Sequence, residues 1–261
     1  MARRLNETEN FLSVVHQLRK RCPWDKKQTH RTLARYLIEE AYEVVAAIEA
    51  GDESGLCEEL GDVLLQVALH AEIANEKKKF SFESVSEQIA DKMVRRHPHV
   101  FKGKKALNYK EHLKNWTLTK AKEKPKKSLL AGIPLALPSL QMAQRYGEIA
   151  GSVGFDWDSS REVMQKVDEE LKELKSASAK TQEEEIGDLL FTLAQLCRHL
   201  KLDAEAVLRK SNKKFASRFE GTVKKARKKK ADLTQLKPSE WDALWQSLKE
   251  GKRYSSRETA S

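Results

Sequence analysis

Apolar residues recur along most of this chain at the spacing of one helix face, and no segment shows the strict alternation of a half-buried strand. One such stripe, with the period of about 3.6 residues of a buried helix face, consists of Leu60, Leu64, Val67, Ala71 and Ala74. Similar patterns predict helices over residues 31–50, 56–78, 160–179, 182–200, 203–230 and 239–250. Only 11 Gly and 6 Pro residues interrupt the 261-residue chain, so the sequence predicts an all-α fold.

The chain also contains an internal repeat. Residues 59–62 (Glu-Leu-Gly-Asp) and the apolar stretch after them match residues 185–188 (Glu-Ile-Gly-Asp) and the stretch that follows there. An aromatic turn stands upstream of each copy, at residues 22–25 (Cys-Pro-Trp-Asp) and at residues 154–158 (Gly-Phe-Asp-Trp-Asp). This self-similarity predicts two related helical units.

Local signals indicate where helices and units begin and end. Thr29 can cap the helix predicted to start after it, and Gly51 followed by Asp is a typical stop. Charge, Pro and Gly cluster at residues 124–134, which favours a connection between the units there. We therefore expect an N-terminal unit over residues 1–127 and a C-terminal unit over residues 128–261.

Each copy carries four acidic residues at helical spacing. They are Glu40, Glu43, Glu59 and Asp62 in the first copy, and Glu170, Glu173, Glu185 and Asp188 in the second. Because residues three or four apart on a helix are neighbours, each set would place two acidic pairs on two adjacent helices. Two carboxylates about 5 Å apart repel by about 3 kcal/mol at an effective dielectric constant of about 20, so four together need a compensating cation.

An acidic cluster is more often a solvated helix face than a site. Here, however, no Lys or Arg stands three or four positions from the acids of the first copy, where a surface ion pair would place one. The arrangement also occurs twice, each time beside the most apolar helix of its unit. We therefore interpret both sets as metal ligands.

The ligand types narrow the choice of metal. Carboxylates alone suit Mg²⁺, with Mn²⁺ as an alternative, and these ions commonly bind phosphate as well. Zinc sites use His or Cys ligands, and di-iron bundles use Glu-x-x-His, a pattern that the sequence does not contain. A P-loop of the form Gly-x-x-x-x-Gly-Lys-Ser/Thr is also absent from the sequence.

The charge and the cysteine content limit which partners and which cellular compartment the sequence is compatible with. The formal net charge of +10, concentrated at residues 102–127 and 224–230, leaves nucleic-acid binding open, although no aromatic interleaving or zinc-finger spacing accompanies it. The 3 cysteines have neither disulfide nor zinc spacing. No apolar run approaches the roughly 20 residues that cross a bilayer. We expect a cytoplasmic protein that does not enter the membrane.

Together these motifs resemble the MazG family of nucleoside triphosphate pyrophosphohydrolases, in its long tandem form. The resemblance rests on both acidic sets, both aromatic turns, Arg-Arg-His-Pro-His-Val at residues 95–100 and Asn-x-x-Phe-x-x-Arg at residues 212–218. It implies two tandem MazG-like helical bundle units, a homodimer and Mg²⁺ dependence. The implied reaction is hydrolysis of a nucleoside triphosphate to monophosphate and diphosphate by water attack on the α-phosphorus.

The two copies differ in the residues that could hold a substrate. The substrate-binding candidates are Lys166, Glu169, Asn212, Lys214, Arg218, Trp245 and Lys120. Lys214 and Arg218 lie one turn apart, whereas Met93 and His97 take their places in the first copy. Compensation by the neighbouring bases Lys92, Arg95 and Arg96 stays open. The second unit is expected to be the main catalyst, and its catalytic residues are then Glu170, Glu173, Glu185 and Asp188. Lys214 as an ordinary solvated base and Trp245 as part of the core are the structural alternatives.

The sequence also leaves open a function that is not enzymatic. The duplicated bundles could form a non-catalytic dimeric module that binds nucleotides or RNA for regulation. Release of diphosphate and monophosphate from a nucleoside triphosphate would separate the two interpretations. No group of residues in the sequence specifies which base is preferred.

Overall fold

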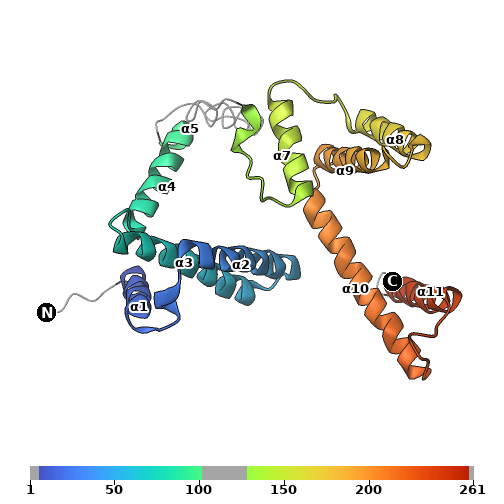
Figure 1. Ribbon diagram of the computed structural model, residues 1–261, viewed down its shortest axis with the longest axis horizontal. Coiled ribbons are helices and arrows are strands. Elements are labelled where there is room, and N and C mark those ends of the chain that lie inside the picture. Colours follow the sequence, from blue (N-terminus) through green and yellow to red (C-terminus); the bar gives the residue numbers. More distant parts are fainter. Residues whose placement is uncertain (1–5, 102–127, 259–261) are drawn as a thin grey trace. The chain divides into compact units, whose positions relative to one another are not determined.

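The computed structural model describes residues 6–101 and 128–258, with side chains described as far as residue 248. These residues form helices and connecting segments, and no strand occurs among them (Figure 1), which confirms the all-α prediction. The chain divides into two compact units, Met1–Asn108 and Tyr109–Ser261. The boundary predicted between residues 127 and 128 adjoins residues 102–127, which lie outside the described residues, and stays a prediction.

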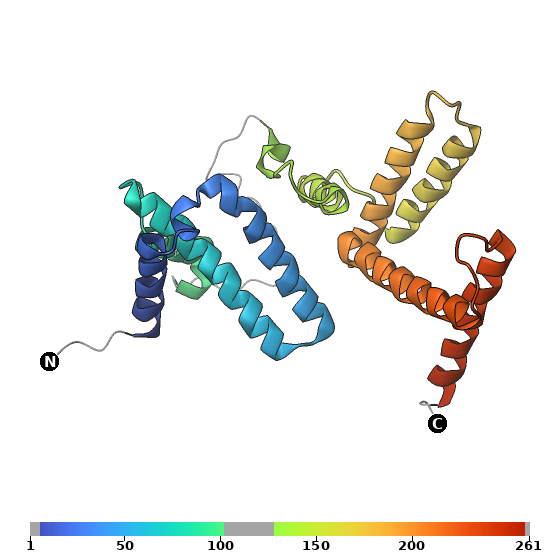
Figure 2. The same cartoon turned by 60° about the horizontal axis from the view of Figure 1, so that its bottom comes forward.

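The first unit is built around a helical hairpin. Its elements are α1 (Glu7–Arg21), the 3₁₀ helix η1 (Asp25–Lys27), α2 (His30–Ala50), α3 (Glu53–Glu76), α4 (Phe82–Arg96) and α5 (Pro98–Phe101). Helices α2 and α3 lie side by side as the hairpin, while α1 and α4 contact α3 (Figures 1 and 2). The acidic residues of the first copy thus lie on two helices that face each other.

The bounds of α2 follow from its caps. The Thr29 side chain accepts a hydrogen bond from the backbone N–H of Thr32, which satisfies one free donor of the first turn. At the other end Gly51 adopts φ of 68°, a left-handed conformation that glycine tolerates best. Asp52 then caps α3 by accepting from the backbone N–H of Gly55. Both boundary signals read in the sequence are confirmed.

The core of the first unit lies at one end of the hairpin. Its buried residues are Val15, Leu33, Ala68, Leu69 and Ile73, from α1, α2 and α3. Arg19 of α1, 8% exposed, closes this end through two hydrogen bonds to Glu76 of α3, at 2.9 Å and 2.7 Å. These contacts fix α1 against the end of α3 that is remote from Glu59.

The second unit repeats the hairpin and adds helices around it. Its elements are η2 (Leu129–Gly132), α7 (Ser139–Ser152), α8 (Ser160–Ser176), α9 (Gln182–His199), α10 (Ala204–Lys228) and α11 (Pro238–Glu258). Helices α8 and α9 form the hairpin, α7 packs on α9, and α10 contacts α7, α9 and α11. Every helix predicted from the periodicity is present in the described chain, with ends shifted by a few residues in several cases.

Two small clusters form the core of this unit. Val163, Val167 and Leu196 pack between α8 and α9, whereas Ala143, Ala194 and Ala204 join α7, α9 and the start of α10. Beside the alanines, the amide of Gln144 donates to the Leu202 carbonyl at 2.8 Å and accepts from the Ala204 backbone at 2.7 Å. The first turn of α10 is thereby held against α7 and the C-terminal half of α9.

The apolar stripe of α3 is buried over only part of its length. Ala71 and Ala74 are buried as predicted, but Leu60 is 52% exposed and Leu64 is 45% exposed. Leu60 and Leu64 stay exposed within the described chain because α1 and the core residues of α2 cover only the C-terminal half of α3. Separately, no helix in the described ranges combines the length and apolar character needed to span a membrane.

Candidate active site

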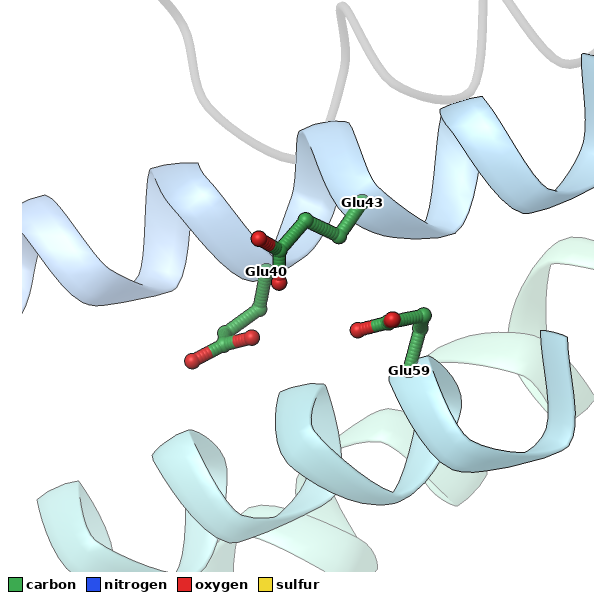
Figure 3. Close-up of side chains that lie close together, drawn as sticks. All are labelled: Glu40, Glu43 and Glu59. Carbon is green, nitrogen blue, oxygen red and sulfur yellow. The ribbon is translucent and has the colours of Figure 1, made fainter. Parts of the chain in front are cut away.

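Three acids of the first set converge between α2 and α3. Glu40 and Glu43 project from α2 toward Glu59 of α3 (Figure 3). One carboxylate oxygen from each of the three lies within 4.8 Å of those of the others. The hairpin thus brings together acids that are 19 residues or fewer apart in the chain, as the helical spacing predicts.

Partial burial and mutual repulsion together raise the pKa values of two acids in this set. Loss of hydration on partial burial raises the pKa of Glu40 above its ordinary value, and the charge of Asp62 raises this pKa further. The pKa of Glu59 is raised for the same two kinds of reason, with Glu43 as its largest neighbouring charge. Asp62 therefore acts electrostatically on both helices, although it is not one of the three converging acids. A cation between the helices would relieve this repulsion.

The second set repeats the geometry in a more buried form. Glu170 and Glu173 of α8 and Glu185 of α9 each offer an oxygen within 4.8 Å of the others. Desolvation raises the pKa of Glu185, and the charges of Glu173 and Asp188 add to the effect. Asp188 itself is exposed and outside the converging three. The structure thus brings together six of the eight predicted metal ligands, three in each unit.

Glu170 is the most informative residue of the second set. Its residue surface is only 4% exposed, and its Oε2 atom is buried without a hydrogen-bond partner in the described part of the chain. A buried acceptor left without a partner costs about 1–3 kcal/mol, and more when it is charged. A hard cation at this oxygen would satisfy it, so the donor set fits a divalent cation such as Mg²⁺.

A lysine distinguishes the second set from the first. Nζ of Lys166 lies 2.8 Å from Oε1 of Glu169 and 2.9 Å from Oε1 of Glu170. These two hydrogen bonds raise the pKa of Lys166, so it is a permanent cation at neutral pH. One turn before Glu40, at the matching position of the first unit, stands Tyr36. The first set has no ion pair with any Lys or Arg of the described residues.

Three of the remaining substrate-binding candidates lie on α10 and not on the hairpin that carries the acids. Asn212, Lys214 and Arg218 lie on α10, whose first residues pack against the end of α9 that is remote from Glu185. Asn212 and Lys214 are exposed, and Arg218 is half-buried. Lys120 lies outside the described residues.

Trp245 belongs to an aromatic contact between α10 and α11. Its ring centroid lies 5.5 Å from that of Phe215, and Trp241 lies 6.2 Å from Phe219 in the same way. The two phenylalanines stack on each other along α10 at 6.1 Å. Trp245 thus packs against α10, and its role in substrate binding stays a prediction.

The sequence did not predict a polar cluster that joins the aromatic turn at residues 154–158 to α9. Arg198 of α9 donates to both carboxylate oxygens of Asp156, at 2.8 Å and 2.5 Å, and His199 lies 3.0 Å from the same carboxylate. These partners lower the pKa of Asp156 from 3.8 to about 2, Arg198 having the larger effect. The aromatic turn in which Asp156 stands was a visible signal, but its partners lie more than forty residues later. The cluster ties this turn to α9.

The basic run at residues 224–230 ends α10. Positive charge at a helix C-terminus interacts favourably with the helix dipole. Nζ of Lys225 also donates to Ser247 Oγ of α11 at 2.9 Å, while Ala226 is buried. Part of the run therefore has a structural role in joining α10 to α11.

Comparison with known proteins places this geometry in a family. The model of the MazG nucleotide pyrophosphohydrolase domain matches residues 28–101 and again residues 159–222, so each match contains one acidic hairpin. A Thermotoga maritima protein named nucleoside triphosphate pyrophosphohydrolase/pyrophosphatase MazG is 43% identical over 248 residues, covering 93% of this chain and 96% of its own.

Further relatives cover almost all of the chain. A nucleoside triphosphate pyrophosphohydrolase of Escherichia coli is 38% identical over 257 residues, which are 94% of this chain and 98% of the relative. A Bacillus subtilis protein named uncharacterized protein YabN is 40% identical over 259 residues, which cover 96% of this chain and 53% of that protein.

Proposed function

Because the chain belongs to the MazG nucleotide pyrophosphohydrolase family, we propose that it hydrolyses nucleoside triphosphates to nucleoside monophosphate and diphosphate. Relatives that match it over nearly their full length carry that activity in their names. The observation that carries the proposal is the second acidic set, with the buried, unpartnered oxygen of Glu170 at its centre. The non-catalytic nucleotide- or RNA-binding module is the less favoured interpretation.

Glu170, Glu173 and Glu185, with Asp188 beside them, would hold Mg²⁺, or Mn²⁺ in its place. Such an ion, when bound, supplies neutralisation of phosphate oxygens and acidification of water. One carboxylate of the set orients the attacking water toward the α-phosphorus and accepts its proton. Because diphosphate leaves with its charge, positioning and electrostatics rather than covalent catalysis account for the rate.

The second unit is proposed as the main catalyst. Its hairpin carries a cation, Lys166, next to the acids, whereas the first hairpin has Tyr36 at that place. On the following helices Lys214 and Arg218 of the second unit correspond to Met93 and His97 of the first. The second unit therefore has more positive charge available for the triphosphate.

The active protein is proposed to be a homodimer of C₂ symmetry. In the described chain, Ile186, Leu190 and Leu193 follow one face of α9 and are 46%, 50% and 38% exposed. Leu60 and Leu64 form a similar exposed pair on α3. Apolar rows of this kind on both hairpins are typical of helix faces that a second subunit covers. In such a dimer, α10 of one subunit could supply Lys214 and Arg218 to the acids of the other.

The proposed compartment is the cytoplasm. The cysteines at positions 22, 57 and 197 are free thiols, which suits a reducing environment. Nucleic-acid binding by the basic run at residues 224–230 is not part of the proposal, since Lys225 already has a contact within the unit.

Substitutions that remove one charge and keep the side-chain size test the catalytic assignment. Glu185→Gln and Asp188→Asn keep side-chain size but remove an anionic ligand. Each should lower kcat for diphosphate release by at least roughly a hundredfold, comparable to the loss of a key electrostatic stabiliser. The matched substitutions in the first set, Glu59→Gln and Asp62→Asn, should lower kcat much less. Equal, severe losses from both sets would show that the first unit also catalyses.

A further inference from the structure

The two acidic sets share their geometry but differ in how their charge is balanced. In the second set, the ammonium of Lys166 lies 2.9 Å from Oε1 of Glu170, while Oε2 of the same carboxylate is buried with no hydrogen-bond partner among the described residues. One oxygen of the central ligand is thus taken by a cation of the protein itself. The lysine side chain is 32% exposed, so it can leave this position without unpacking the hairpin.

The first set has no such cation. Tyr36 replaces the lysine, and the nearby guanidinium of Arg35 lies over the Tyr36 ring, 4.5 Å from its centroid, where it also donates to the tyrosine hydroxyl. No ion pair joins Glu40, Glu43 or Glu59 to a basic residue within residues 6–101 and 128–248. No basic side chain of the described residues therefore balances the charge of these three converging carboxylates.

We propose that Lys166 is a built-in counter-ion that weakens binding of free divalent cations by the second acidic set. The first set, which lacks it, then binds the cation more tightly when no nucleotide is present. The reason is competition: a metal ion at the second set must share Glu170 with the ammonium or displace it, whereas a metal ion at the first set displaces only water.

This asymmetry has a consequence that rests on the proposed function. A bound triphosphate offers the ammonium of Lys166 other anionic partners, which removes the competition at Glu170. The second set would then take up its cation only together with substrate. The competition itself requires neither hydrolysis nor nucleotide, so it is tested separately from the activity.

The test is titration of the full-length chain with Mn²⁺ alone, with free Mn²⁺ followed by electron paramagnetic resonance. Glu59→Gln disables the first set and isolates the second. In that background, Lys166→Met, which removes the charge and keeps an unbranched chain, should tighten Mn²⁺ binding at least tenfold. The matched control is Lys172→Met, which removes an exposed charge from the same helix and should change the affinity less than twofold. Circular dichroism confirms that each variant is folded.

The converse substitution, in the first set, tests the same proposal without relying on the folding of Lys166→Met. In a Glu185→Gln background, Tyr36→Lys places the counter-ion beside Glu40 and should weaken Mn²⁺ binding at the first set at least tenfold. Unchanged or weaker binding by the folded Lys166→Met protein would overturn the proposal. So would unchanged affinity in the Tyr36→Lys protein, and this result decides the matter if Lys166→Met does not fold. Absence of triphosphate hydrolysis by the unsubstituted protein, together with the predicted Mn²⁺ affinities of the variants, would instead count against the proposed function alone.

Discussion

Replacing Asp156 by Asn should destabilise the second unit through a single, identifiable interaction. The substitution keeps the size of the side chain and removes its charge. Asp156 accepts two hydrogen bonds from Arg198 and lies 3.0 Å from His199, so the change leaves both bases without their anion. Arg198 also donates to Gln195 at 2.9 Å, which in turn donates to the Ala143 carbonyl at 2.7 Å. The effect should therefore extend to the packing of α7 on α9.

The magnitude follows from the pKa of Asp156. A fall from 3.8 to about 2 corresponds to about 2.5 kcal/mol, at about 1.4 kcal/mol per pH unit. Because the site is partly exposed to solvent, screening reduces this to about 1–1.5 kcal/mol. A lowered pKa stabilises the fold above the unfolded-state value of 3.8, and the contribution is lost as the pH falls toward about 2.

The assay is urea denaturation of both proteins at several pH values, followed by circular dichroism. At pH 7, Asp156→Asn should lower the free energy of unfolding by about 1–1.5 kcal/mol. The difference should shrink below about pH 4, because the unfolded chain then takes up a proton at Asp156 while the folded carboxylate stays ionised down to about pH 2. Asp158→Asn, in the same turn but without an ion pair among the described residues, is the control and should change stability little. A difference that stays constant down to pH 3, or one that Asp158→Asn reproduces, would refute the reasoning.

Three further substitutions test packing, assembly and substrate binding. Gly147→Ala should lower the free energy of unfolding, measured by urea denaturation, by about 1–3 kcal/mol, because the new Cβ would lie 1.8 Å from Oε1 of the buried Gln195. The control is Gly187→Ala, which should not destabilise the protein because nothing lies within 4 Å of the new Cβ. Leu190→Glu should shift the protein toward the monomer in light scattering, and an unchanged mass would argue against α9 as the dimer face. Lys214→Ala should raise KM and lower kcat for triphosphate hydrolysis, because a phosphate contact stabilises both the bound substrate and the transition state. Unchanged kinetics would support the alternative that Lys214 is an ordinary solvated base.

Helix spacing within the sequence predicted the features of the fold that depend on local pattern. Both hairpins follow from acids and apolar residues three or four positions apart, and Thr29 and Gly51 mark the ends of α2. Helix α1 was missed, although Asn6 and Glu9 form a reciprocal capping box that the sequence displays.

Features that depend on distant partners could not be predicted. Asp156 is in a visible motif, but its function as an anchor depends on Arg198, 42 residues later in the chain. The exposure of Leu60 and Leu64 shows a second limit. Periodicity identifies an apolar face, but not whether the same chain or another one covers it.

In the proposed reaction, the second acidic set directs water to the α-phosphorus of a nucleoside triphosphate. Hydrolysis in ¹⁸O-labelled water with Mg²⁺, with the products analysed by mass spectrometry, tests this step directly. We expect monophosphate and diphosphate, with the label in the monophosphate, and loss of turnover in Glu185→Gln. Formation of diphosphorylated nucleoside and inorganic phosphate, or label found in the diphosphate instead, would contradict it.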